Sequence, residues 1–346
     1  MSEKQILAGG VPIGGGAPVT VQSMTNTKTE DVAATVRQIQ ELEAAGCDIV
    51  RVAVPTMEAA HAVGAIREQI HIPLVVDIHF DYHLAVEAAA AGADKIRINP
   101  GNIGDTERVR QVVHACKLRG LPIRIGVNGG SLEKELLEKY GGVTAEAMFE
   151  SAMGHVKILN RLDFDDICIS VKSSSVPLTV AAYRLIARET EYPLHLGVTE
   201  AGTERMGVIK SAVGIGTLLM EGIGDTIRVS LTADPVREVL AGIDLLKAAG
   251  IRRGGVQIIS CPSCGRCGID LIRVADEVEK RLQGCKKNIT VAVMGCAVNG
   301  PGEASGADFG LAGGKGEGIL FRAGKIVRKV PADSMVDELV KMIEES

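Results

Sequence analysis

The stretch Asp31–Val54, DVAATVRQIQELEAAGCDIVRVAV, contains one complete unit of the pattern that decides the fold. Its first half places Val32, Val36, Ile39 and Leu42 on one face, because these positions recur at helical spacing. A glycine follows, as it commonly does at the end of a helix. The second half is a short β-branched run in which apolar side chains alternate with others, as in a strand. The unit is therefore a helix that leads into a strand.

The same unit recurs along the first 250 residues, where short β-branched runs alternate with amphipathic segments rich in Ala, Glu and Arg. The runs are Val19–Gln22, Ile49–Val54, Leu74–Ile78, Lys95–Asn99, Ile123–Val127, Ile167–Val171, Leu194–Thr199 and Ile227–Leu231. Eight strand-and-helix units over about 250 residues predict an α/β protein built on a (β/α)8 TIM barrel. A doubly wound open sheet is the alternative.

Composition limits the class of protein. The chain has 346 residues, of which 46% are hydrophobic and only 3% aromatic, so its core must be aliphatic, as where helices pack on parallel strands. A net charge of −5 argues against a nucleic-acid-binding protein. No apolar run approaches the ~20 residues of a membrane span, and the N-terminus has no signal-peptide core. We therefore expect a soluble cytoplasmic protein, in which clustered cysteines indicate metal rather than disulfides.

One face of the predicted strands is aliphatic throughout, whereas the other face, which would line the barrel, is polar. The cations on this inner face are Arg51, Lys95, Arg97, Arg124, Lys172 and Arg228. Because Asp77 alone does not balance them, the barrel is expected to bind a multiply charged anion, and a phosphate or diphosphate fits best. The alternative is that each cation lies at a strand end and extends into water.

From about residue 254 the composition changes, and we assign residues 1–250 to the barrel and residues 251–346 to a second, small α/β domain. Strands are expected at Val256–Ser260 and Ile289–Met294, with an amphipathic helix at Leu271–Leu282. The glycine-rich stretch 299–318 is expected to be a loop around a site.

Four cysteines indicate a metal site in the second domain. Cys261, Cys264 and Cys267 have two residues between each pair, and Cys296 follows the strand that ends at Met294. This spacing favours an iron–sulfur cluster over zinc, because zinc ribbons use two separated pairs of cysteines. A closed site of four cysteines is compatible with it, although spacing alone does not show that Cys267 is a ligand.

Seven stretches together resemble a known family. They are VQSMTNT from Val21, RINPGN from Arg97, GVN from Gly126, LGVTEAG from Leu196, RVSL from Arg228, ISCPSCGR from Ile259 and MGCAVNGPGE from Met294. Over essentially its whole length the chain is similar to the bacterial 4-hydroxy-3-methylbut-2-enyl diphosphate synthases of the methylerythritol phosphate route to isoprenoids. The resemblance implies a barrel followed by a small iron–sulfur domain.

The resemblance also implies a cofactor, a reaction and partners. A 4Fe-4S cluster would be held by Cys261, Cys264, Cys296 and Glu303, with Cys267 as a neighbour that is not a ligand. The implied reaction is reductive ring opening of 2-C-methyl-D-erythritol 2,4-cyclodiphosphate to the linear allylic diphosphate. Flavodoxin or ferredoxin would donate the electrons, and the working form would be a head-to-tail homodimer.

Roles in the barrel follow as hypotheses. Glu200 is assigned to proton transfer, and Glu303 would be an exchangeable iron ligand. The residues expected to bind or orient the diphosphate are Arg51, Asp77, His79, Arg97, Asn99, Arg124, Asn128, Lys172, Arg228 and Ser230. Apart from Ser230, all of these and Glu200 are expected at or near the C-terminal ends of the strands, where barrels bind their substrates. A barrel lyase or transferase with a structural zinc site, and a redox-sensing binding protein, are the alternatives.

Overall fold

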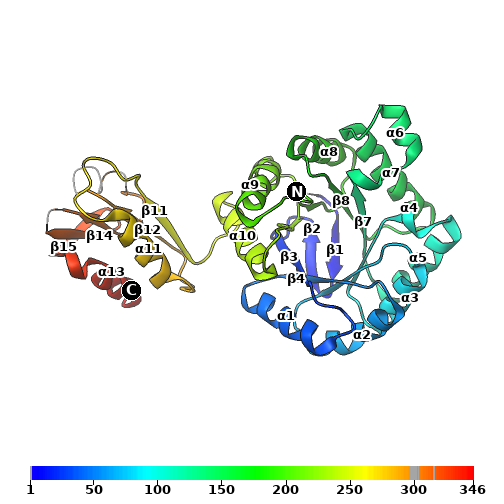
Figure 1. The fold of residues 1–346 in the computed structure, drawn as a ribbon, viewed down its shortest axis with the longest axis horizontal. Coiled ribbons are helices and arrows are strands. Elements are labelled where there is room, and N and C mark those ends of the chain that lie inside the picture. Colours follow the sequence, from blue (N-terminus) through cyan, green and yellow to red (C-terminus); the bar gives the residue numbers. More distant parts are fainter. Residues whose placement is uncertain (1, 297–301, 303, 315) are drawn as a thin grey trace. The chain divides into compact units, whose positions relative to one another are not determined.

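The computed structural model describes residues 2–296, 302, 304–314 and 316–346, and the chain divides into two compact units, Met1–Arg252 and Arg253–Ser346 (Figure 1). Each unit has a hydrophobic core of its own. None of the described helices has the length and apolarity that crossing a membrane requires.

The first unit is a ring of parallel strands surrounded by helices (Figure 1). The strands pair in the order β8-β7-β6-β5-β4-β3-β10-β9, and a parallel bridge between Ile169 and Leu194 joins the two ends of this order. The strands are β3 (Thr20–Met24), β4 (Ile49–Ala53), β5 (Leu74–Asp77), β6 (Lys95–Ile98), β7 (Ile123–Asn128), β8 (Ile167–Lys172), β9 (His195–Leu196) and β10 (Thr226–Ile227). The predicted TIM barrel is confirmed, and the open sheet is wrong.

The outer helices follow the strands in sequence and cover them with aliphatic side chains. They are α1 (Val32–Ala44), α2 (Met57–Arg67), α3 (Tyr82–Ala91), α4 (Pro100–Ile103), α5 (Thr106–Arg119), α6 (Lys134–Tyr140), α7 (Ala145–Arg161), α8 (Val176–Glu189), α9 (Glu204–Met220) and α10 (Pro235–Ala248). Side-chain caps fix many of their starts, as where Asp31 accepts a hydrogen bond from the Ala34 amide. Gly120 ends α5 in the left-handed conformation that glycine adopts without strain.

An antiparallel hairpin, β1 (Gln5–Ala8) and β2 (Val11–Gly14), precedes the barrel and was not predicted. Its Ile6 and Ile13 are buried in one cluster with Ile49, Val75 and Cys168 of the barrel strands. These strand residues belong to the inner face, so the hairpin fills the N-terminal end of the barrel with apolar side chains. Each strand of the hairpin is only four residues long, which gives sequence periodicity little to detect.

The second unit is a five-stranded sheet in the order β11-β12-β13-β14-β15, with two helices on one face. Its elements are β11 (Val256–Ser260), α11 (Leu271–Leu282), β12 (Ile289–Met294), β13 (Phe309–Gly313), β14 (Glu317–Arg322), β15 (Lys325–Pro331) and α13 (Met335–Glu344). The first three strands are parallel, and β14 and β15 continue the sheet antiparallel.

The expectation of a loop from 299 to 318 is wrong in its second half, because β13 is the central strand of this sheet. Its glycines serve packing, since a Cβ on Gly310 would lie 2.2 Å from the Phe321 ring and one on Gly313 would lie 2.5 Å from Ile269. Glycine in a strand commonly marks such a close approach.

Candidate functional site: a cationic barrel interior and a cysteine-bearing domain

The register of the strands determines which side chains meet inside the barrel. When the pairing of residues is followed from Gln22 of β3 through every neighbouring strand and back to β3, it returns at position 14. The strands are therefore staggered by eight residues around the barrel, as is typical of TIM barrels. With this stagger, inner residues of alternate strands form layers of four. From the floor toward the C-terminal end, the layers are Ile49, Lys95, Cys168 and Thr226; Gln22, Val75, Arg124 and His195; Arg51, Arg97, Ser170 and Arg228; and Met24, Asp77, Gly126 and Gly197.

Apart from Val75, the two central layers are polar where most TIM barrels are filled with branched apolar residues. The aliphatic face packs outward against the helices, as the alternation predicted. The cations therefore lie inside the barrel, and the alternative in which every one of them extends into water is wrong for the deepest two. Lys95 and Arg124 are both completely buried.

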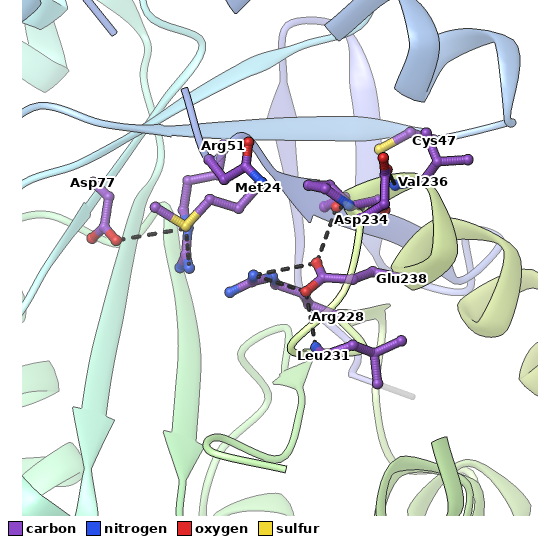
Figure 2. A network of polar contacts seen from close by, with 12 residues as sticks. Met24, Cys47, Arg51, Asp77, Arg228, Leu231, Asp234, Val236 and Glu238 are labelled. Carbon is purple, nitrogen blue, oxygen red and sulfur yellow. Dashed lines mark hydrogen bonds and ion pairs between the residues drawn. The ribbon is translucent and has the colours of Figure 1, made fainter. Parts of the chain in front are cut away.

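Asp77 organises the upper part of this interior. Its carboxylate accepts a hydrogen bond from Arg97 Nη1 at 2.8 Å and lies 3.7 Å from Arg51 Nε and from His79 Nε2. Burial alone would raise the pKa of the Asp77 carboxyl, but Arg51, His79 and Arg97 outweigh it and hold that pKa well below its usual range. Arg51 also directs Nε and Nη2 toward the Met24 sulfur, at 3.2 and 3.0 Å (Figure 2).

The deepest cations have no partner. The Lys95 amine and all three Arg124 nitrogens are buried without a hydrogen bond to any residue that the structure describes. Burial first, and neighbouring arginines second, lower the pKa of Lys95 to about 8 and that of Arg124 to about 10. The expectation that Arg124 lies near the end of its strand is wrong, because it is the second residue of β7 and pairs with Cys168.

Two further polar side chains in the layer of Arg124 also lack partners. Both nitrogens of His195 and both polar atoms of the Gln22 amide are buried without a hydrogen bond in the described part of the chain. Burial, followed by the charges of Arg124 and Lys172, lowers the pKa of His195 well below its usual value, so its imidazole is neutral. Because buried polar groups are normally paired, this layer has donors available for a ligand or for water.

Two glycines in the upper layer leave room for the cationic side chains. A Cβ on Gly126 would lie 2.4 Å from Arg97 Nε, and one on Gly197 would lie 2.7 Å from Lys172 Nζ. Lys172 is buried at the end of β8 and has no hydrogen bond or ion pair to the residues described. The glycines therefore allow Arg97 and Lys172 to lie across the barrel rather than along its wall.

Replacing Gly126 by alanine should push Arg97 away from Asp77. We expect KM for the substrate to rise by about 10- to 100-fold, because a displacement of about 1 Å at a positioning group has effects of this size. Gly130→Ala is the matched control, since a Cβ there meets no heavy atom within 4 Å. Steady-state kinetics of both variants check this, and an unchanged KM in Gly126→Ala would contradict the role of the glycine.

The other predicted residues lie around the C-terminal end of the barrel. Asn99 has a structural role, because its side-chain oxygen accepts the Gly101 amide at 3.1 Å and caps α4. Asn128 ends β7, and Ser230 lies partly buried three residues beyond β10. Glu200 is exposed beyond β9 and forms no ion pair with the described residues. Its backbone has a φ of 51°, a conformation that residues other than glycine rarely adopt and that is more common at functional sites.

Sequence reasoning missed Glu238 of α10, the second buried carboxylate among these cations. It forms an ion pair with Arg228, at 3.2 Å between Nη2 and Oε2 (Figure 2). The signal was present, because Glu238 falls on the apolar face of its helix with Pro235, Val239 and Gly242. A carboxylate at such a position needs a buried partner.

In the second unit, Cys261 and Cys267 both lie close to Gly295, the residue before Cys296. The Gly295 amide donates a hydrogen bond to Cys261 Sγ at 3.3 Å, and a Cβ on Gly295 would lie 2.5 Å from Cys267 Sγ. The Cys267 thiol instead donates to the Ile269 carbonyl at 3.2 Å. A sulfur that accepts an amide hydrogen bond suits a ligand of an iron–sulfur cluster, whose properties depend on hydrogen bonds to its sulfurs.

This arrangement fits an iron–sulfur cluster. Cys264 is exposed in the same loop, and Cys296 is half-buried just beyond the end of β12. Within the described residues, no three His, Cys, Asp or Glu side chains converge as a single metal ion requires. The four cysteines thus do not form a closed tetrahedral site in this structure. Glu303, the fourth ligand that the resemblance implies, lies outside the described residues.

A TIM barrel with a cationic interior, joined to a small domain whose cysteines suit an iron–sulfur cluster, defines a class of redox enzyme. The profile of the GcpE TIM-barrel domain matches residues 3–243, and that of the GcpE protein C-terminal domain matches residues 257–345. The chain belongs to the GcpE family.

Relatives match over almost their full length. The chain is 61% identical to "4-hydroxy-3-methylbut-2-en-1-yl diphosphate synthase (flavodoxin)" of Geobacter sulfurreducens, covering 99% of this chain and 97% of that protein. It is 60% identical to the protein of the same name from Clostridium perfringens, with 99% and 98% covered. Among solved structures, the dihydropteroate synthase of Yersinia pestis matches with a TM-score of 0.50 at 17% identity, over 72% of this chain and 98% of that one. This likeness shows the barrel fold alone.

Proposed function

We propose that this protein catalyses the reductive ring opening of 2-C-methyl-D-erythritol 2,4-cyclodiphosphate to (E)-4-hydroxy-3-methylbut-2-enyl diphosphate, in isoprenoid biosynthesis. It is an oxidoreductase of the 4-hydroxy-3-methylbut-2-en-1-yl diphosphate synthase type, with flavodoxin as the electron donor. The observation that carries the proposal is the uncompensated charge inside the barrel. Six inner cations have two carboxylates as ion-pair partners among the described residues, Asp77 and Glu238. A diphosphate supplies the charge that is missing.

The binding residues act in two groups. Arg51 and Arg97, held by Asp77, and Arg228, held by Glu238, form one layer of guanidinium groups that suits bidentate binding of phosphate oxygens. Arg124 extends the positive charge beneath that layer, and Lys172 extends it above. His79, Asn128 and Ser230, and the unbonded atoms of Asn99, would orient the substrate at the rim.

The second unit would hold a 4Fe-4S cluster through Cys261, Cys264, Cys296 and Glu303. Such a cluster, when bound, supplies the two electrons of the reduction and an iron that a carboxylate releases more readily than a thiolate does. The hydrogen bond that the Gly295 amide donates to Cys261 Sγ supports this assignment. Cys267 is assigned to packing, because its thiol is directed at the Ile269 carbonyl.

The proposal includes a working form and a location. We infer a head-to-tail homodimer in the cytoplasm, where thiols stay reduced and available to iron. Sedimentation of the anaerobically purified protein tests the dimer, and a monomer with full activity would contradict it.

Glu200 is the residue assigned to proton transfer, because it is a carboxylate at the mouth of a cationic barrel. Its positive φ of 51° is a second reason, since such backbone strain is more common at functional sites. Glu200→Gln is expected to lower kcat by about 10²- to 10⁴-fold with little change in KM, the usual effect of removing a general acid. Glu204→Gln, which changes a half-buried carboxylate paired with Arg237 on the following helix, is the control. Wild-type turnover in Glu200→Gln would end this assignment.

Anaerobic purification, followed by iron and sulfide analysis and one turnover assay, tests the function as a whole. The expected result is iron and sulfide in equal amounts and formation of the linear allylic diphosphate with reduced flavodoxin. Zinc without iron or sulfide would select a barrel lyase or transferase instead. Binding of the cyclic diphosphate without any allylic product would select a redox-sensing binding protein.

A further inference from the structure

Glu238 is the only side chain of an outer helix among the described residues that forms an ion pair with an inner cation of the barrel. Its carboxylate accepts three hydrogen-bond donors from different segments: Ser23 Oγ of β3 at 3.1 Å, Arg228 Nη2 at 3.2 Å and the Leu231 amide at 2.9 Å. The residue is 4% exposed, so these contacts replace water almost completely.

The Arg228 guanidinium is held from one side only. Its Nη2 contacts both Glu238 oxygens, at 3.2 and 3.4 Å, while its Nε is buried and has no partner among the described residues. Figure 2 shows the Glu238 carboxylate between the Arg228 side chain and the backbone of Leu231. The remaining donors of Arg228 are therefore free for a ligand, while the carboxylate restrains the side chain.

The same carboxylate also restrains the loop after β10. Because the Leu231 amide is bound to Glu238, the backbone next to Ser230 is fixed to the first turns of α10. Asp234 caps this helix through the Val236 amide at 2.8 Å, and the positive end of the helix favours a carboxylate close by. Arg228 and Ser230 are thus oriented by one residue that is itself outside the barrel.

We propose that Glu238 is a positioning residue for diphosphate binding, which it serves by setting the orientation of Arg228 and of the loop carrying Ser230. The inference rests on the proposed function, since its ligand is the cyclic diphosphate. Glu238 and Asp77 play the same role. Glu238 forms an ion pair with Arg228 and Asp77 forms one with Arg97, and each carboxylate orients its arginine while leaving other donors of that arginine free for a ligand.

Glu238→Gln is the test, because glutamine keeps an oxygen for the Leu231 amide but turns a donor toward Arg228. We expect KM and the dissociation constant of the cyclic diphosphate to rise by about 10- to 100-fold, with kcat within about threefold of the wild type. Glu238→Asp keeps the charge and should recover part of the affinity. Asp244→Asn, an exposed carboxylate on the same helix, should leave both constants unchanged.

A double-mutant cycle separates this role from a general loss of folding. If Glu238 acts through Arg228, the Glu238→Gln change should have little effect on affinity once Arg228 is already methionine. Equal effects in both backgrounds, or wild-type affinity in Glu238→Gln, would overturn the proposal. If the wild-type protein itself does not bind the cyclic diphosphate, the proposed function fails instead, so the two failures are distinguishable.

Discussion

Arg124→Met should make the ligand-free barrel more stable and at the same time almost inactive. Arg124 is completely buried, and none of its three nitrogens has a partner among the described residues. A buried charge without a partner opposes folding, and methionine fills a similar volume without a charge. Because no carboxylate of the described residues pairs with Arg124, its removal leaves none of them unpaired.

The expected gain in the free energy of unfolding is about 1–4 kcal/mol, the range found when buried ion pairs are replaced by apolar residues, and the unpaired charge of Arg124 favours a gain. The expected loss in kcat/KM is about 100- to 1,000-fold, because a fixed positive charge beneath the diphosphate is removed from an interior that excludes water. Thermal unfolding of the ligand-free protein and steady-state kinetics measure the two effects. Arg184→Met is the control, because Arg184 is paired with Glu221 on the surface. This change should alter neither the free energy of unfolding nor kcat/KM by much. A destabilised Arg124→Met would contradict the account of an uncompensated interior.

Cys296→Ser should abolish the iron–sulfur cluster, whereas Cys267→Ser should retain it. The Cys267 thiol donates to the Ile269 carbonyl, and a serine hydroxyl can do the same. Loss of a thiolate ligand removes an iron site outright, because metal binding requires the deprotonated sulfur.

Iron and sulfide content, together with the visible absorption of the anaerobically purified variants, measures this difference. We expect wild-type content in Cys267→Ser and turnover of at least about half the wild-type rate, against almost no iron and no turnover in Cys296→Ser. The reverse result would restore Cys267 as a ligand in a closed four-cysteine site.

The inner face of the barrel was predictable because strand periodicity is strict. Once Arg51, Arg97 and Arg228 were placed on one face by alternation, the fold brought them into one layer. The depth of Arg124 was missed although the predicted strand and β7 both begin at Ile123, because the sequence does not show how neighbouring strands are staggered around the barrel. Depth decides its physical role, since a cation at the mouth is hydrated and a cation in the second layer above the floor is not.

Glu238 and β13 were missed for related reasons. Glu238 reaches the barrel from a helix, so no rule about strand faces could include it, although its position on the apolar face of α10 was a usable signal. β13 was taken as loop because of its glycines, whereas Gly310 is there to admit the Phe321 ring. Both errors come from interpreting a residue by its own type rather than by the neighbour that it accommodates.

The central claim is that the uncompensated charge of the barrel interior binds the diphosphate. The most direct measurement is a calorimetric titration of the oxidised protein with the cyclic diphosphate, for the wild type and for Arg124→Met. The account predicts binding to the wild type with one diphosphate per chain, and an affinity at least about 100-fold weaker in Arg124→Met. Equal affinities in the two proteins would contradict it.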